Sequence, residues 1–336
     1  MKYLKNTIYT LILVAALGSC GKKNRFEIDT DKNRINVTVK RFDRDFLTLD
    51  VTDLKTGTTN LQEKYPDFYP LFVNNVLNRD TEEVDSITND LKNYLRDSTF
   101  AGVNRDVAAK FGDIAHIEKT LSDAYTRIHH YFPETVLPDI YFFVSGFYRS
   151  MLLSPGIIAI SADMYLGADY PLYEDVSYRY LIQNMRPESI PVEIISAILF
   201  GSFTSRSDQN RLIDRMIFQG KMFYLTAVCM PDEAKENIMG YTKEQWDWCG
   251  KYERDIWRAI IDRKDLFSSD TRLIRTYIDD APFTASVSQD SPGRVGTWIG
   301  WRIVESYMNN NTDIDLHDLM STHDTQKILE DSGYHP

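Results

Sequence analysis

The residue with the clearest chemistry is Cys20, the last residue of the segment Leu17–Cys20. An apolar stretch, residues 8–17, precedes it, and the basic residues Lys2 and Lys5 precede that stretch. A positive head, an apolar core and small residues before a cleavage point are typical of a secretory signal. When a cysteine follows the small residues directly, the pattern is that of a bacterial lipoprotein signal, in which the thiol takes up the lipid. The sequence therefore predicts cleavage of residues 1–19 and lipidation of Cys20. The alternative is an ordinary signal peptide followed by an incidental cysteine.

The predicted lipid is the anchor of the mature chain. Residues 8–17 are too few to form a transmembrane helix, which needs about 20 apolar residues. Each buried methylene of an acyl chain contributes roughly 0.8 kcal/mol, so several chains hold a protein durably on a bilayer. The polar residues 20–33 are predicted to be the lipidated cysteine and a short tether.

A second group of residues is arranged as in a zinc site, but the ligands are missing. Zincin metalloproteases carry H-E-x-x-H on a helix, with two histidine ligands and a glutamate base, and a third ligand follows from a later helix. Here the helix reads Val192-Glu193-Ile194-Ile195-Ser196, and Gln219 stands before Gly220 at the position of the third ligand. The sequence predicts a degenerate zincin site made of Val192, Glu193, Ser196 and Gln219.

Each of the three replacements removes a metal ligand. Valine has no donor atom, serine is a poor neutral donor, and glutamine brings no charge. A structural zinc site contributes on the order of 10–16 kcal/mol over its ligands, so their loss should abolish useful affinity. Without the ion no bound water reaches a pKa of about 7, and Glu193 has nothing to activate. We expect no metal, no cofactor and no catalytic residue, and we interpret Glu193 as a solvated carboxylate on an exposed helix face.

Three other groups of residues are predicted to be structural. Asp279 and Asp280 stand before Ala-Pro-Phe and are expected in a loop without a calcium-binding pattern. The segment 297–301, with two tryptophans, is expected in the core rather than as a ligand platform. Cys229 and Cys249 leave two alternatives open, a disulfide of an exported protein or two buried thiols.

The elements that must position these residues follow from the periodicity of apolar residues. Alternation over residues 35–39 predicts a half-buried strand, and short apolar runs predict strands at 139–144 and 156–161. Helical periodicity is found at 61–132, 190–199, 209–228 and 295–308, and a last short helix ends at Gly333. The prediction is an α+β fold, mostly helical, with a small sheet beside the Glu193 helix and a zincin-like layout. Residues 34–336 are expected to form one globular domain.

Composition limits the class of partner. The full chain has 336 residues and a net charge of −11; the signal contains two of the 38 basic residues and no acidic one, so the mature charge becomes −13. This acidity argues against nucleic acid and against anionic lipid surfaces as partners. The expected partners are therefore proteins. The membrane is a further partner only through the lipid anchor.

Short segments distributed along the mature chain carry a resemblance to a known family. The chain resembles the GldB-type gliding-motility lipoproteins of the Bacteroidetes, a group distantly similar to zincin peptidases. The segments are residues 41–46, 65–69, 156–161, 163–167, 292–301 and 328–336.

The resemblance implies an outer-membrane-associated lipoprotein, connected with surface motility in gliding species, and it does not imply catalysis. We predict a lipid-anchored, non-catalytic envelope protein that acts through contacts with envelope proteins, in gliding or secretion machinery. The basic residues Lys22 and Lys23 after Cys20 favour the periplasmic face, and surface exposure remains the alternative. Two other functions stay open: a peptidase-like hydrolase with an unusual metal site, and a module that binds envelope polysaccharide.

Overall fold

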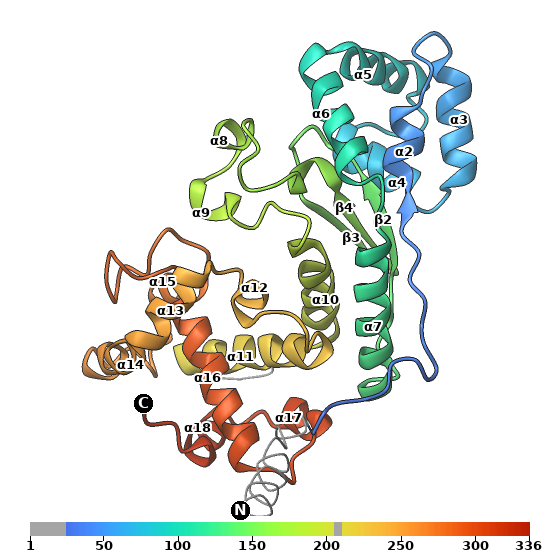
Figure 1. Ribbon diagram of the computed structural model, residues 1–336. Helices are drawn as coiled ribbons and strands as arrows, with labels where there is room; N and C mark the ends of the chain where they lie inside the picture. Colours follow the sequence, from blue (N-terminus) through green and yellow to red (C-terminus); the bar gives the residue numbers. More distant parts are fainter. Residues whose placement is uncertain (1–24, 205–209) are drawn as a thin grey trace, which may run out of the picture. The chain divides into compact units, whose positions relative to one another are not determined.

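The computed structural model describes residues 25–204 and 210–336 (Figure 1). The chain divides into two compact units, Met1–Asn33 and Arg34–Pro336. In the first unit the described residues, 25–33, contain turns, and the Asp29 side chain accepts a hydrogen bond from the backbone of Asp31. The predicted signal at residues 1–19 and Cys20 lie outside the described residues. The elements below all belong to the second unit.

The second unit contains a sheet of four strands in the order β1-β2-β4-β3. Strands β1, β2 and β4 are parallel, and β3 is antiparallel to β4. Parallel strands need covering on both faces, so the apolar runs of β2 and β4 agree with their position in the middle of the sheet. The strands are β1 (Lys40–Arg41), β2 (Asp139–Phe143), β3 (Met151–Ser154) and β4 (Ile157–Ser161).

The predicted strands at 139–144 and 156–161 are confirmed as β2 and β4. Strand β3 was not predicted, because four residues ending at a proline give little alternation. Pro155 and Gly156 form the turn between β3 and β4, and Gly156 has a φ of +74°, which glycine adopts without strain. The α+β prediction with a small sheet is correct.

Residues 35–39 are extended but do not form a strand. The backbone N–H groups of Ile35, Val37 and Val39 donate to side chains of helix α7 (Ala115–Tyr131), each at 2.9 Å. The acceptors lie four residues apart on that helix: Thr126, Ser122 and Glu118. Two residues of extended chain span about 6.7 Å and four residues of helix about 6 Å, so the spacings nearly match. The predicted strand at 35–39 is therefore wrong: the segment is extended and alternates, but it is bound to a helix and does not pair with a strand.

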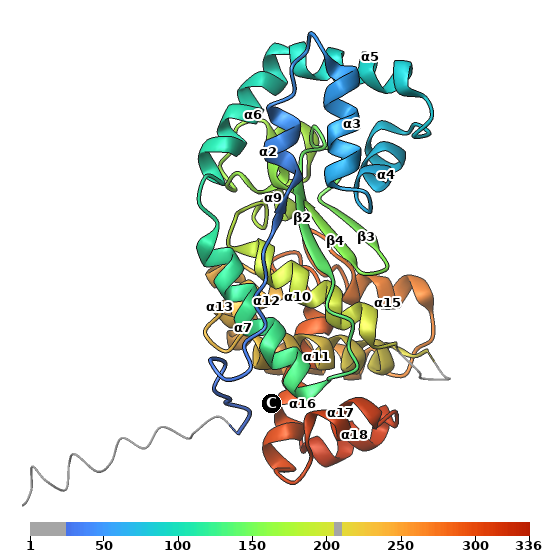
Figure 2. The same ribbon diagram turned by 90° about the vertical axis from the view of Figure 1, so that its right-hand side faces the viewer.

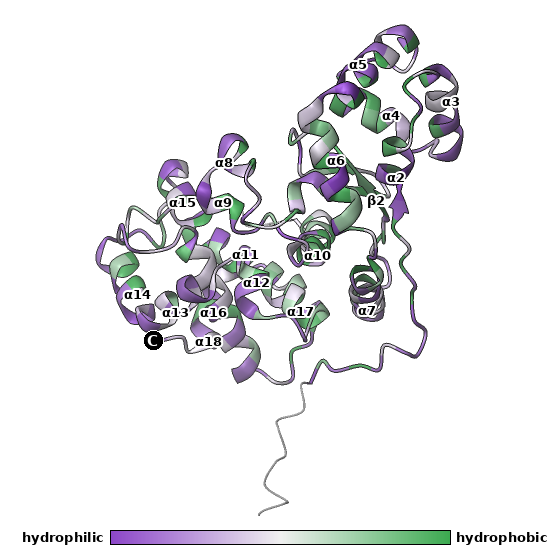
Figure 3. Ribbon diagram, turned by 45° about the horizontal axis from the view of Figure 1, so that its top comes forward, coloured by the Kyte–Doolittle hydropathy of each residue, from purple (hydrophilic) through white to green (hydrophobic). Residues whose placement is uncertain are grey.

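The region between β1 and β2 is helical, as predicted for residues 61–132. In α6 the Asp97 side chain accepts hydrogen bonds from the first-turn N–H groups of Thr99 and Phe100, which is the usual way to satisfy a helix start. Figure 3 shows hydrophilic residues along the outer helices α3 and α5 and hydrophobic residues around β2. The helices are α2 (Phe42–Leu47), α3 (Leu54–Lys64), α4 (Tyr69–Phe72), the π-helix η1 (Val73–Leu77), α5 (Val84–Arg96), α6 (Ser98–Lys110) and α7.

Aromatic residues of this helical region cover both faces of the sheet. Phe68, just before α4, lies against Tyr141 and Phe143 of β2, with ring centroids 4.8 and 5.8 Å apart. Because side chains alternate along a strand, Phe142 faces the other side, where it meets Phe111 at the end of α6.

The rest of the chain is helical. It begins with the 3-10 helix η2 (Ala162–Tyr165), α8 (Tyr173–Val176), α9 (Arg179–Ile182), α10 (Ser189–Ser202) and α11 (Leu212–Cys229). It continues with α12 (Lys235–Met239), α13 (Lys243–Lys251), α14 (Glu253–Asp262), α15 (Thr271–Ile278), α16 (Val295–Asn310), α17 (Leu316–Ser321) and α18 (Thr325–Ser332). The predicted helices at 190–199, 209–228 and 295–308 are confirmed as α10, α11 and α16, and Gly333 ends α18 with a φ of +58°.

Helices α11 and α16 cross in close contact (Figures 1 and 2). A Cβ added to Gly220 would lie 2.2 Å from the carbonyl oxygen of Gly300, and one added to Gly300 would lie 1.8 Å from that of Met216. Only glycine allows backbones to approach so closely. Trp298 and Trp301 are both 2% exposed, which confirms that the segment 297–301 packs in the core.

Cys229 and Cys249 are buried free thiols, so the structure selects the second of the two alternatives for them. Burial raises the pKa of each thiol to about 12, which keeps both protonated at neutral pH. None of the helices in the described ranges, 25–204 and 210–336, combines the length and apolar character that spanning a bilayer requires.

Candidate functional site

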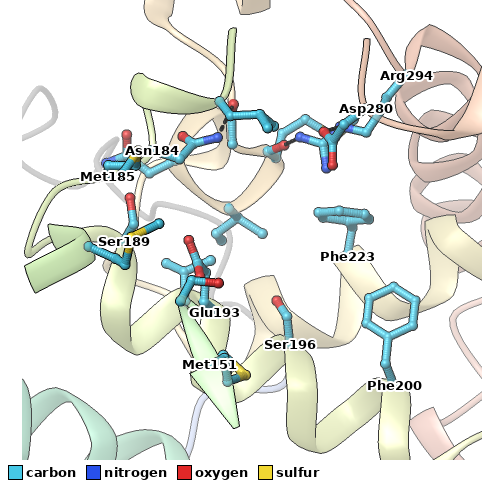
Figure 4. A pocket seen from close by; sticks show the side chains of 18 of the residues that line it. Met151, Asn184, Met185, Ser189, Glu193, Ser196, Phe200, Phe223, Asp280 and Arg294 are labelled. Carbon is cyan, nitrogen blue, oxygen red and sulfur yellow. Dashed lines mark hydrogen bonds and ion pairs between the residues drawn. The ribbon is translucent and has the colours of Figure 1, made fainter. Parts of the chain in front are cut away.

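A cavity of about 730 Å³ brings together the four residues of the predicted degenerate site. Val192, Glu193 and Ser196 lie on one face of α10, since positions three and four apart on a helix point the same way. Gln219 comes from α11, which packs against α10. Helices α10 and α11 thus place all four residues of the predicted site around one cavity. Figure 4 shows the cavity from close by.

Glu193 points into this cavity, and it is only partly exposed. The interpretation of Glu193 as a solvated surface carboxylate is therefore wrong. Burial raises the pKa of its carboxyl group to about 7, and the negative charge of Asp280 acts in the same direction. A hydrogen bond from Tyr165 and the positive charge of Arg294 oppose the rise without cancelling it. Glu193 is thus poised to change its charge near neutral pH.

Tyr165 fixes the position of the Glu193 carboxylate. Its hydroxyl group donates to Oε2 of Glu193 over 2.5 Å. The backbone around Tyr165 is held in turn by Tyr173, whose hydroxyl group donates to the carbonyl of Asp163 and accepts from the N–H of Leu166. These bonds lie in the buried interior, so the helix η2 presents Tyr165 in one orientation.

The Asp163 carboxylate anchors the loop that leads into β3. It is fully buried and accepts hydrogen bonds from the backbone N–H groups of Ser145 and Phe147 and from the hydroxyl of Ser161. A buried carboxylate with this many donors stabilises the surrounding backbone. Asp163 therefore has two roles: its carboxylate holds the loop before β3, and its backbone carbonyl accepts the Tyr173 bond near Tyr165.

The wall opposite Glu193 contains an ion pair. Arg294 lies 3.0 Å from Asp280 and also donates to the carbonyl of Met239. The neighbouring Gly240 has a φ of +71°, and a Cβ there would lie 2.9 Å from the Arg294 guanidinium. The positive φ of this loop position thus favours glycine. Asn184 donates to the carbonyl of Gly240 and completes this wall.

Methionine side chains form much of the remaining lining. Met151, Met164, Met185 and Met239 all border the cavity, together with Phe200 and Phe223. Methionine is flexible and polarizable, so it adapts to occupants of different shape. The cavity thus combines an adaptable apolar lining with a few fixed polar groups.

Comparison with known proteins gives the family. Over residues 23–336 the chain matches the family described as gliding motility protein GldB. The chain belongs to the GldB family. This is a lipoprotein-type family named for motility rather than for an enzyme activity. Neither a curated protein nor a solved structure matches this chain. The likeness to zincins stays a prediction.

The sequence did not single out several residues of the cavity in this GldB-family chain. Tyr165 and Arg294 occur in segments quoted for the family resemblance, but nothing in their spacing connects them with Glu193. Asp279 and Asp280 lie in a loop, as predicted, and the fold brings that loop to the cavity. Met151 lies in the strand that was not predicted. Contacts between separate segments, such as Tyr165 with Glu193 and Arg294 with Met239, decide these placements, and periodicity carries no signal for them.

The chemistry open to this GldB-family cavity is binding and proton exchange. Within the described part of the chain, no three His, Cys, Asp or Glu side chains gather so that they could hold a metal ion. Val192, Ser196 and Gln219 add no charged ligand to Glu193. The groups present can donate and accept hydrogen bonds, pair with a charge and enclose an apolar side chain.

Proposed function

We propose that this GldB-family protein is a non-catalytic, lipid-anchored envelope protein whose cavity holds part of a protein partner, in gliding or secretion machinery. Lipid on Cys20 would anchor it in the outer membrane, on the periplasmic side. Residues 20–33 would then connect the lipid to the domain 34–336, after removal of residues 1–19.

One observation carries the proposal. The helix face and neighbouring helix that would present metal ligands in a zincin instead line a cavity with Val192, Ser196 and Gln219, beside a methionine-rich wall. Such a lining suits the adaptable binding of side chains. It gives Glu193 no metal-bound water to activate. We infer a pseudo-metalloprotease whose former catalytic space serves recognition.

Isolation of the native lipidated protein from membranes tests this role. We expect specific envelope proteins to be isolated with it, without added polysaccharide. Ser196→Tyr would fill part of the cavity and should abolish their recovery, whereas Ser202→Tyr, on the exposed end of the same helix, should not. If no protein is isolated with the wild type, or if Ser196→Tyr retains the partners, the proposal is wrong.

A hydrolase is the second candidate, and the Glu193–Tyr165 pair is the observation that favours it. A carboxyl group with a pKa of about 7 is suited to general acid–base catalysis near neutral pH. Metal analysis of the purified protein, combined with assays on peptide substrates, separates the two candidates. Stoichiometric zinc, lost together with a hydrolytic activity, would overturn the non-catalytic proposal.

A further inference from the structure

Strand β3 has an open edge beside the cavity. In the sheet order β1-β2-β4-β3 it is the last strand, and none of the other described strands pairs with its outer side. The N–H of Ser161 donates to the carbonyl of Ser150, so Ser150, Leu152 and Ser154 direct their backbone groups towards β4. By the antiparallel alternation, Met151 and Leu153 direct theirs outwards. These outward groups are able to pair with another strand.

The edge is apolar rather than protected by charge. Leu153 in β3 is 64% exposed, and Tyr148 just before the strand is 65% exposed. Edge strands that must not pair usually carry charges, prolines or bulges. Within β3 itself, residues 151–154 include no charged residue and no proline; Arg149 and Pro155 flank the strand, so the open edge is limited to these four residues.

Side chains of an added strand would reach the cavity. Met151 and Leu153 point to the same face of the sheet, because they are two residues apart. Met151 lines the cavity next to Glu193 (Figure 4). A residue paired with Met151 on the open edge would direct its side chain to that same face, and so into the cavity.

The charges of the cavity define the side chain that fits. Its described lining includes the acidic residues Glu193, Asp279 and Asp280, and Arg294 is the one basic side chain among them. Arg294 pairs with Asp280, and Asp279 pairs with Arg275, at 3.0 and 2.9 Å. Glu193 has the Tyr165 hydroxyl as a neutral partner and no cation at hydrogen-bond distance among the described residues. A cationic side chain is therefore complementary to this cavity.

We propose that an extended segment of a partner protein adds to β3 as a further strand and places a lysine or arginine side chain against Glu193. This inference rests on the proposed function and names its partner class. Backbone pairing with Met151 and Leu153 would provide affinity, as in other cases of strand addition, and the cavity would provide specificity.

Binding should depend on pH because the cation needs an ionised Glu193. The charged or titratable groups facing Glu193 are Tyr165 from η2, Asp280 from the loop before α16, and Arg294 at the start of α16. Burial and Glu193 raise the pKa of Tyr165 well above its ordinary value, so Tyr165 stays neutral. With a Glu193 pKa of about 7, the ionised fraction rises about tenfold between pH 6 and pH 8. Affinity should rise by a similar factor.

Peptide binding to the full-length protein, purified in detergent, is the test. The probe is a fluorescent pool of acetyl-X-X-Lys-X-X-amide, in which X is an equimolar mixture of Val, Thr, Leu, Tyr and Ser. The comparison pool replaces lysine by norleucine, which keeps the length and removes the charge. We expect the lysine pool to bind at least tenfold more tightly at pH 8. Glu193→Gln should abolish this preference, and Glu188→Gln, an exposed position at the start of the same helix, should keep it.

The edge itself is tested by a proline. Leu153→Pro removes only an outward N–H, while Leu153→Ala keeps that N–H and loses the exposed side chain. We expect the proline variant to bind at least tenfold more weakly than the alanine variant. Equal affinity for the two pools, or equal binding by the two Leu153 variants, contradicts the inference. The peptide test can contradict the inference while Ser196→Tyr still abolishes the recovery of partners from membranes. In that case the proposed function stands, and only binding by strand addition is wrong.

Discussion

At the scale of single residues, Glu193 connects the stability of the fold with pH. Its carboxyl group has a pKa of about 7 in the folded protein and about 4.5 when solvated. The folded state therefore binds more protons than the unfolded state between these values, so the free energy of unfolding falls as pH rises from about 4.5 to 7. The fall due to this group is roughly 3 kcal/mol at most.

Replacing Glu193 by glutamine should remove this pH dependence. Glutamine stays neutral and still accepts the Tyr165 hydrogen bond, so Glu193→Gln should match the wild type at pH 5 and be more stable at pH 8. The difference is measured by urea denaturation at several pH values. Glu188→Gln is the matched control and should follow the wild-type curve. The free energies of unfolding of the wild type and of Glu193→Gln should differ more at pH 8 than at pH 5. If the difference is the same at both pH values, the carboxyl group is not buried as described.

At the scale of elements, the crossing of α11 and α16 brings two helix backbones into close contact, and both helices position parts of the cavity. Gly220 follows Gln219 in α11, and Arg294 is the residue before α16 begins. A methyl group at Gly220 or Gly300 would meet backbone atoms, which cannot move out of the way as a flexible side chain can. The two helices would have to separate.

We therefore expect Gly220→Ala and Gly300→Ala each to lower the free energy of unfolding by about 3 kcal/mol or more, at the upper end of overpacking effects. The control is Gly250→Ala in α13, where an added Cβ meets nothing within 4 Å. Alanine is the better helix former, so this variant should be more stable by about 0.5–1 kcal/mol. Thermal unfolding distinguishes these outcomes, and equal effects at all three glycines would contradict the described crossing.

At the scale of the whole molecule, the lipid on Cys20 is expected to decide where the protein is found. Cys20→Ala removes the thiol that would form the thioether. Residues 34–336 form their own compact unit, so the unfolding transition should not change. Without acyl chains the acidic chain has little affinity for anionic lipid, and it should accumulate as a precursor or as soluble periplasmic protein.

Fractionation after growth with labelled palmitate measures this. We expect label and membrane retention in the wild type and in Ser19→Ala, which keeps a small residue before the cysteine, and neither in Cys20→Ala. Normal labelling of Cys20→Ala would contradict the lipoprotein prediction and the localisation based on it.

The sequence by itself determined those features that depend on local patterns: the main helices and strands and the grouping of the four site residues. Apolar periodicity was enough to place α10, α11, α16 and the strands β2 and β4, because each element repeats its own spacing. The order of Val192, Glu193, Ser196 and Gln219 was enough to predict that they share one site. The fold satisfies this, since one helix face and one neighbouring helix supply all four.

Tertiary structure decided what depends on distant neighbours. The alternation at 35–39 showed an extended segment, but its partner is α7, whose acceptors recur at nearly the same spacing as a strand would offer. Glu193 looked like a surface residue because helical periodicity does not reveal what covers a helix. Tyr165 and the Asp280–Arg294 pair reach it from separate segments, and their burial and charge set its pKa. Chemistry that arises from such contacts exists only once the chain has folded.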